Sequence, residues 1–143
     1  MAIAGKMDNK KYRVYCILGD GELEEGQVWE AAMTANKYKL DNLCVIVDNN
    51  NLQIDGTIEE VKGLEHIEEK FESFGFNVIT VNGNKIADLI QAFDKAKTTK
   101  GKPTAIVAIT TKGKGVSFME NQASWHGKAP NEAQYKQAME ELQ

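Results

Sequence analysis

Two short polar segments, Gly19-Asp20-Gly21 and Asp48-Asn49-Asn50-Asn51, contain the residues with the clearest potential for chemistry. Each directly follows a run of apolar and β-branched residues, so each is expected where a strand ends. Asp20 offers a carboxylate and Asn50 an amide oxygen, and glycines let the backbone approach a ligand closely. Mg²⁺ prefers octahedral oxygen ligands and usually keeps phosphate oxygens and water among them. One carboxylate, one amide and one loop carbonyl therefore predict a metal that bridges the chain to a diphosphate.

Each segment alone has a simpler explanation. A single Gly-Asp-Gly is commonly a turn, and a run of asparagines after a strand is commonly a loop. The pair carries more weight because two successive strands would supply complementary ligands. From the residues alone, the interpretation stops at a phosphate–metal site in an α/β domain.

The periodicity of apolar residues predicts alternating strands and helices, which is typical of a parallel sheet with helices on both faces. In such a sheet, ligands bind outside the carboxyl ends of the strands. Three polar or Gly-rich loops, Gly19–Gly26, Asp48–Gly56 and Thr111–Gly127, should therefore lie at one edge. The expected strands span 12–18, 43–47, 77–81 and 104–110, and the expected helices span 26–38, 64–74, 85–97 and 131–143.

Several side chains are expected in the core. Cys16 and Cys44 lie in apolar runs and are expected to be buried, reduced thiols, which favours an intracellular, cytoplasmic protein. Two helices should bury one apolar face each, formed by Ile67, Phe71 and Phe74 in the first and by Ile86, Leu89, Ile90 and Phe93 in the second.

Composition excludes several classes of protein. The chain has 143 residues, which suits one domain, and 42% of them are hydrophobic. Its formal net charge of −4 gives no basic footprint for nucleic acid. No apolar run reaches the roughly 18 residues of a membrane helix. The first residues, MAIAGKM, resemble the end of a helix more than a signal peptide.

The string GDGELEEGQVWEAAMTANKYKLDNLCVIVDNNNLQIDG resembles the cofactor motif of thiamine-diphosphate enzymes, a GDG followed later by an Asn pair. The phrases NKYKLDNL, NNNLQIDG and WHGKAPNE are similar to the N-terminal, diphosphate-binding subunit of split transketolases. The resemblance covers essentially the whole chain. It implies the thiamine-diphosphate-binding fold and the transfer of a two-carbon ketol unit between sugar phosphates.

The resemblance also implies roles for individual residues. Asp20 and Asn50 would ligate the metal through side chains and Leu52 through its carbonyl, with Mg²⁺ expected and Ca²⁺ or Mn²⁺ also acceptable. The remaining residues of the motif, Gly19, Gly21 and Glu22, would complete the cofactor loop, with the Gly21 amide reaching the diphosphate.

Three further residues match family positions. Glu25 would lie at a dimer interface, linked by hydrogen bonds to a partner's catalytic glutamate. Ile54 would line the cofactor ring, and His126 would lie near the diphosphate and the sugar, although a loop histidine could merely satisfy a local hydrogen bond. His66 is expected to be solvated. For Lys112 and Lys114, phosphate contact and a solvated loop are equally good interpretations.

The family pattern is incomplete in this sequence. Members carry about a hundred residues before this region, including a Gly-His-Pro-Gly type segment, so residues 1–143 form a single but incomplete domain. The pyrimidine-binding half would belong to a C-terminal partner subunit. The chain alone is therefore expected to be inactive, and marginally stable or oligomeric because apolar surface would be exposed.

Two alternatives stay open. One is a related thiamine enzyme, such as a deoxyxylulose phosphate synthase or a ketoacid dehydrogenase component, although WHGKAP argues against both. The other is a non-catalytic remnant or binding module that needs a partner chain.

Overall fold

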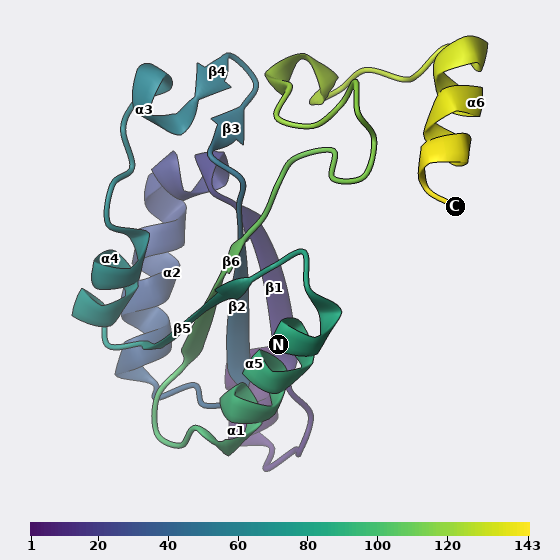
Figure 1. Cartoon of the computed structure of the whole chain (residues 1–143). Coiled ribbons are helices and arrows are strands. Elements are labelled where there is room, and N and C mark those ends of the chain that lie inside the picture. Colours follow the sequence, from purple (N-terminus) through teal and green to yellow (C-terminus); the bar gives the residue numbers. More distant parts are fainter.

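A four-stranded parallel sheet forms the centre of the molecule. The computed structural model describes all residues from Met1 to Gln143 and shows the strand order β1-β2-β6-β5 (Figure 1). Every neighbouring pair in this sheet is parallel, as the alternation of strands and helices predicts. The strands are β1 (Val14–Gly19), β2 (Leu43–Asn49), β5 (Asn77–Asn82) and β6 (Thr104–Ile109).

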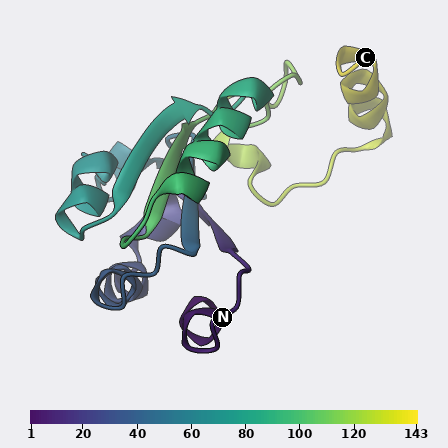
Figure 2. The same cartoon turned by 90° about the horizontal axis from the view of Figure 1, so that it is seen from below.

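Helices cover both faces of the sheet, which confirms the expected fold class. In the view of Figure 2, α5 lies on one side of the sheet and α2 on the other, while α6 stands away from the body. No helix of the chain combines the length and the apolar character that a membrane span requires. The helical segments are α1 (Ala2–Met7), η1 (Gly21–Glu24), α2 (Gly26–Lys37), α3 (Ile58–Val61), α4 (Ile67–Ser73), α5 (Ile86–Thr98), η2 (Ala123–Trp125) and α6 (Glu132–Glu141).

Alternate residues of the central strands enter two separate cores. Val45 and Val47 of β2 join the larger core, together with Phe71 of α4 and Ala32 and Ala35 of α2. The smaller core lies on the opposite face, where Cys44, Ala92, Ala96 and Ile106 pack together. The split follows from the pleat, which turns successive side chains to opposite faces of a strand. A two-sided core explains why the central strands are apolar throughout.

Local signals set several helix ends where the sequence predicts them. Gly75 follows α4 with a φ of +83°, and a Cβ there would lie 2.5 Å from the Asn36 side chain. Only glycine satisfies both demands. Asn131 begins α6 with a capping box, in which its side chain accepts from the Gln134 amide and the Gln134 side chain accepts from the Asn131 amide.

Two expectations about buried side chains are wrong. Cys16 is exposed, because β1 is an edge strand and its side chain lines an open hollow between β1 and α2. Cys44 is buried as expected, and burial raises the pKa of its thiol to about 11. Ile86 and Ile90 are 76% and 55% exposed, because α5 approaches the sheet through the small side chains of Ala92 and Ala96 instead.

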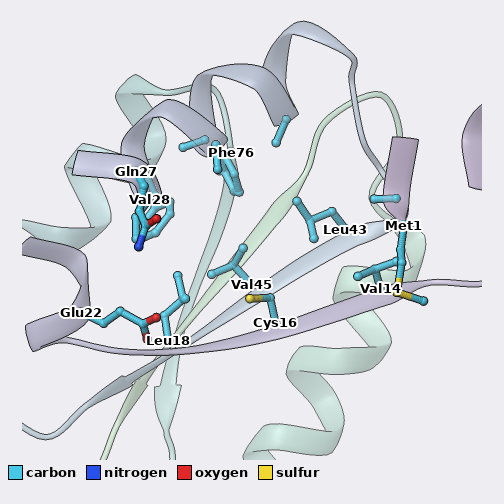
Figure 3. Close-up of a pocket in the computed structure, with 15 residues that line it drawn as sticks. Met1, Val14, Cys16, Leu18, Glu22, Gln27, Val28, Leu43, Val45 and Phe76 are labelled. Carbon is cyan, nitrogen blue, oxygen red and sulfur yellow. The ribbon is translucent and has the colours of Figure 1, made fainter. Parts of the chain in front are cut away.

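An apolar hollow of about 480 Å³ lies between α2 and the edge of the sheet at β1 (Figure 3). Val14, Cys16 and Leu18 of β1 line it together with Val28 of α2. On the other face of β1, Ile17 is 74% exposed. The edge strand β1 therefore presents apolar side chains on both of its faces. α5 packs mainly on β5 and β6 and reaches β1 through the edge-to-face contact of Phe93 with Tyr15.

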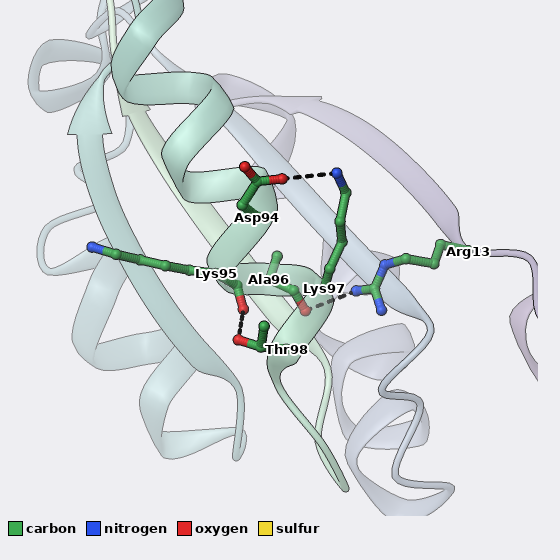
Figure 4. Close-up of polar contacts among 6 residues, drawn as sticks. All are labelled: Arg13, Asp94, Lys95, Ala96, Lys97 and Thr98. Atoms are coloured by element: carbon green, nitrogen blue, oxygen red, sulfur yellow. Dashed lines mark hydrogen bonds and ion pairs between the residues drawn. The ribbon is translucent and has the colours of Figure 1, made fainter.

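Arg13 connects the beginning of β1 to the end of α5 (Figure 4). Its guanidinium donates to the carbonyl oxygen of Ala96 at 3.1 Å and to that of Asp41 at 2.9 Å. Ala96 lies in the last turn of α5, where the helix dipole favours a cation and its carbonyl otherwise accepts only a long hydrogen bond, of 3.3 Å, from the Thr99 amide. This half-buried side chain holds together segments that lie far apart in the sequence.

We predict that Arg13→Met lowers the free energy of unfolding by about 1–3 kcal/mol, because two partly buried carbonyl groups lose a charged donor. Urea denaturation measures the loss. Lys95→Met is the matched control, since Lys95 lies on the same last turn but its side chain makes no hydrogen bond or ion pair. An equal loss in both variants would show that charge at the helix end, rather than the hydrogen bonds of Arg13, stabilises the fold.

We also predict that the isolated chain self-associates through the exposed edge strand, because unpaired strands with apolar side chains favour association. Ile17→Lys should shift the chain toward the monomer in size-exclusion chromatography with light scattering. Ile86→Lys is the control, since Ile86 is similarly exposed, at 76%, but lies on α5. A monomeric wild-type chain with a cooperative thermal transition would contradict this prediction.

Candidate functional site

The carboxyl ends of the parallel strands gather the loops that the sequence singles out. Gly19 at the end of β1 lies opposite Asp48 of β2, and the amide of Asp20 donates to the Asp48 carbonyl at 3.2 Å. Asn49, at the end of β2, lies opposite Ile109 of β6. The loop after β6 therefore starts from the same edge and leads away to α6 (Figure 1). The prediction that the three loops begin at one edge of the sheet is confirmed.

Asp20 is the most deeply buried polar residue of this edge, with only 1% of its surface exposed. One carboxylate oxygen accepts from the Gly21 amide at 2.9 Å, and the other accepts from the Asn51 amide. Burial raises the pKa of this carboxyl above its ordinary value, because the charge is removed from water. Hydrogen bonds from backbone amides oppose that effect, and the neighbouring Asp48 adds to it. The carboxylate is thus held firmly without a cationic side chain.

Asn50 immediately precedes Asn51, whose amide donates to the Asp20 carboxylate. Its side-chain oxygen accepts from the Leu52 amide at 3.0 Å, an Asx-type turn that fixes the direction of the loop. Leu52 then begins the short strand β3 (Leu52–Gln53), which pairs with β4 (Gly56–Thr57) in an antiparallel hairpin. The structure thus brings Asp20 together with the segment that carries Asn50 and Leu52.

The surroundings of Asp20 are acidic. Asp48 accepts a hydrogen bond from the Thr110 hydroxyl, and Glu22 accepts from the Gly19 amide at 3.2 Å. All of the ion pairs of the chain lie elsewhere. No cluster of three or more His, Cys, Asp or Glu side chains that could hold a metal is present, so a metal here would need amide and carbonyl oxygens as well.

A cleft of about 610 Å³, with both polar and apolar side chains in its lining, opens beside this edge on the α5 side of the sheet. Asp48 and Asn50 line it from β2 and the loop that follows, while Asn84 and Lys112 line it from two other loops. Lys112 forms no ion pair, whereas Lys114 pairs with Glu120 at 3.1 Å. Lys112 is therefore the lysine of this cleft whose charge is free to bind an anion. The sequence alone could not distinguish Lys112 from Lys114 in this respect.

The Gly-rich loop after β6 turns tightly at Gly113. Its φ is +70°, and a Cβ at this position would lie 2.6 Å from the carbonyl oxygen of Met119. The amide of Asn121 donates to the Lys112 carbonyl at 3.0 Å and closes the loop. Glycine is required at position 113 because the two arms of the loop nearly touch.

His126 lies further along this loop and is exposed. The preceding residue, Trp125, donates from its indole N–H to the Phe118 carbonyl at 3.0 Å. The Trp125 and Phe118 rings also pack together, with their centroids 5.4 Å apart. The Lys128 ammonium lies 4.9 Å from the centroid of the Trp125 ring and makes a cation–π contact with it. The loop is therefore anchored, but His126 does not line the cleft shared by Asp48, Asn50 and Lys112.

The other residues singled out by the sequence are solvent-facing. Glu25 is exposed at the N-terminus of α2 and makes no capping hydrogen bond. Ile54 is 68% exposed in the turn of the β3–β4 hairpin. His66 begins α4 with a φ of +56° and lies beside Glu65 and Glu69, exposed as expected.

Sequence reasoning missed the hairpin that follows Asn50 and the contacts that hold it. Gln53 donates from its amide nitrogen to the Glu24 carboxylate at 2.9 Å. Thr57 forms a capping box with Glu60 at the start of α3. The pattern Thr-x-x-Glu at 57–60 is a readable signal for that helix start. The Gln53–Glu24 contact has no local signal, because it joins residues from two separate loops.

The sequence matches the family described as "Transketolase, thiamine diphosphate binding domain" over residues 4–143. One component of the apulose-4-phosphate transketolase of Phocaeicola vulgatus is 47% identical over 142 residues, which cover 99% of this chain and 50% of that protein. Human transketolase is 43% identical over 143 residues, covering 99% of this chain and 22% of that protein. The chain thus spans half the length of the first relative and less than a quarter of the second.

Solved structures give the same result. The transketolase of Campylobacter jejuni superposes with a TM-score of 0.89 at 34% identity, over 99% of this chain and 22% of that one. A Pichia stipitis transketolase in complex with sedoheptulose 7-phosphate superposes with a TM-score of 0.88 at 29% identity, over 99% and 22% of the two chains. Because the family match covers nearly every residue, this chain belongs to the thiamine diphosphate binding domain family of transketolases.

Proposed function

We propose that this chain holds the diphosphate end of thiamine diphosphate through a divalent metal, as the N-terminal part of a split transketolase. The observation that carries the proposal is Asp20, a buried carboxylate at the end of β1 with backbone amides as its only partners. An ionised carboxylate in such a place is costly unless a cation compensates it. The neighbouring charge of Asp48 increases that cost.

The donor set fits a hard divalent ion. The Asp20 carboxylate, the Asn50 side-chain oxygen and the Leu52 carbonyl would be the protein ligands, and phosphate oxygens would take further positions. Mg²⁺ is the expected ion, and Ca²⁺ or Mn²⁺ would accept the same oxygens. Gly21 supports this arrangement, since a Cβ there would lie 2.9 Å from the Cβ of Gln53, so the loop can close only around glycine.

The other residues would serve the cofactor and the substrate. When bound, thiamine diphosphate supplies the reactive ring carbon that carries a two-carbon unit, while the protein binds and orients it. Gly19 and Glu22 complete the cofactor loop. Lys112 offers a cation to phosphate oxygens from the adjoining cleft. His126 would approach the diphosphate and the sugar from its separate loop.

The remaining half of the site would come from a pyrimidine-binding C-terminal subunit. Exposed Glu25 is available at such an interface, and exposed Ile54 is available to line the cofactor ring. Relatives of similar sequence are named as subunits of transketolases for apulose 4-phosphate and for 6-deoxy-6-sulfo-D-fructose. Apulose 4-phosphate is a sugar phosphate, whereas the second sugar carries a sulfonate and no phosphate. With the first of these relatives as the guide, sugar phosphates are the substrate class that we propose for the complete assembly.

The test is reconstitution with the candidate partner subunit. We expect the complex to bind thiamine diphosphate in the presence of Mg²⁺ and to transfer ketol units from ketose phosphates, with pyruvate inactive. The 143-residue chain alone should show no transfer.

Asp20→Ala should abolish metal-dependent cofactor binding. The control is Asp55→Ala in the turn of the β3–β4 hairpin, which should leave cofactor binding unchanged. Cofactor binding without any transfer would favour a non-catalytic binding module.

A second prediction concerns pH. Because the folded-state pKa of Asp20 is raised above 3.8, the metal-free folded chain binds this proton more tightly than the unfolded chain. The contribution of Asp20 to stability should therefore fall as pH rises from 3.8 through the folded-state pKa. Urea denaturation of wild type and Asp20→Asn across this range measures it. The stability of wild type relative to the variant should decrease with rising pH, and a constant difference would contradict the raised pKa.

A further inference from the structure

The two loops that carry the proposed metal ligands touch each other through a pair of side chains. Glu24 ends η1 in the first loop, and Gln53 lies in β3 of the second. The Gln53 amide nitrogen donates to the Glu24 carboxylate at 2.9 Å. A hydrogen bond to an ionised acceptor is stronger than one between neutral groups. This contact crosses from one loop to the other without using any proposed ligand.

The backbones of the loops also approach closely at this contact. A Cβ on Gly21 would lie 2.9 Å from the Cβ of Gln53 and 3.7 Å from the Ile58 side chain. Ile58 is itself buried, with 4% of its surface exposed. The side chain of Gln53 therefore leaves β3 directly over Gly21, next to Asp20. Any displacement of Gln53 would move the hairpin relative to the buried carboxylate.

Gln53 is linked covalently to a proposed ligand. The Leu52 carbonyl belongs to the peptide unit whose nitrogen is that of Gln53, and this unit is planar. Holding the Gln53 side chain thus restricts the direction of the Leu52 carbonyl. The hairpin cannot do this alone, since β3 and β4 have two residues each and isolated short hairpins are marginally stable.

We propose that Gln53 and Glu24 are positioning residues, which set the metal affinity of the site by holding the Leu52 carbonyl and Asn50 in place relative to Asp20. The proposal rests on the proposed function, because it requires a metal at Asp20. Neither side chain touches the metal. Since Gln53 is neutral, the contact fixes Glu24 without adding a cation beside the site.

The test measures the affinity of the full chain for Mn²⁺ in the presence of thiamine diphosphate, with free Mn²⁺ followed by electron paramagnetic resonance. Four proteins are compared: wild type, Gln53→Glu, Glu24→Gln and the double variant that exchanges the two residues. The exchange restores an amide-to-carboxylate hydrogen bond with donor and acceptor reversed, at the net charge of wild type. Urea denaturation of each protein checks that the fold is intact.

Charge alone and positioning predict opposite results for Gln53→Glu. An added carboxylate near the site would strengthen Mn²⁺ binding through Coulomb attraction. Loss of the contact, with two carboxylates facing each other, should instead weaken binding by about tenfold. The double variant should recover to within about threefold of wild type. Gln27→Glu, an exposed position on the first turn of α2, adds the same charge without breaking the contact and should not weaken binding.

The outcomes separate this proposal from the proposed function. If Asp20→Ala abolishes Mn²⁺ binding but Gln53→Glu leaves it unchanged or strengthens it, the positioning role is wrong and the metal site stands. If the double variant fails to recover while remaining folded, the role is also wrong. Equal binding by wild type and Asp20→Ala would overturn both proposals. Gln53→Met removes the hydrogen bond without adding charge and decides the question if Gln53→Glu unfolds the hairpin.

Discussion

The parallel pairing of β1 with β2 places Gly19 opposite Asp48, and the features of the carboxyl edge depend on this register. A shift of one residue would turn Asp20 to the other face of the sheet, since side chains alternate along a strand. With the observed register, Asp20 enters a buried position where the Asn51 amide reaches its carboxylate. Because β1 is also one of the two edge strands of the sheet, fraying there would move the loop at its end.

This edge combines properties that oppose stability. A buried carboxylate lies near a second carboxylate, and glutamates occupy the neighbouring turn. Such an arrangement is expected at sites that bind a ligand, where the folded state accepts a local cost for function. The rest of the fold offsets this cost with a two-sided core and with contacts such as Arg13 at the end of α5.

The sequence by itself determined the alternation of the four main strands with helices, the C-terminal end of α4 and the start of α6, and the placement of three loops at one edge. These features follow from periodicity, from glycine and capping residues, and from the connectivity of parallel strands, all of which are local or topological. The sequence also nominates Asp20 and Asn50 as metal ligands, because oxygen-bearing side chains follow two successive strands; this role stays a prediction.

Only the tertiary structure decided how the sheet is covered and how the loops are held. Cys16 is exposed because of its strand's place at the edge, and Ile86 faces outward because small alanines let α5 approach the sheet. The contact between Gln53 and Glu24 and the availability of Lys112 depend on which loops meet in space. These contacts join residues that are far apart in the chain, so no local sequence pattern predicts them.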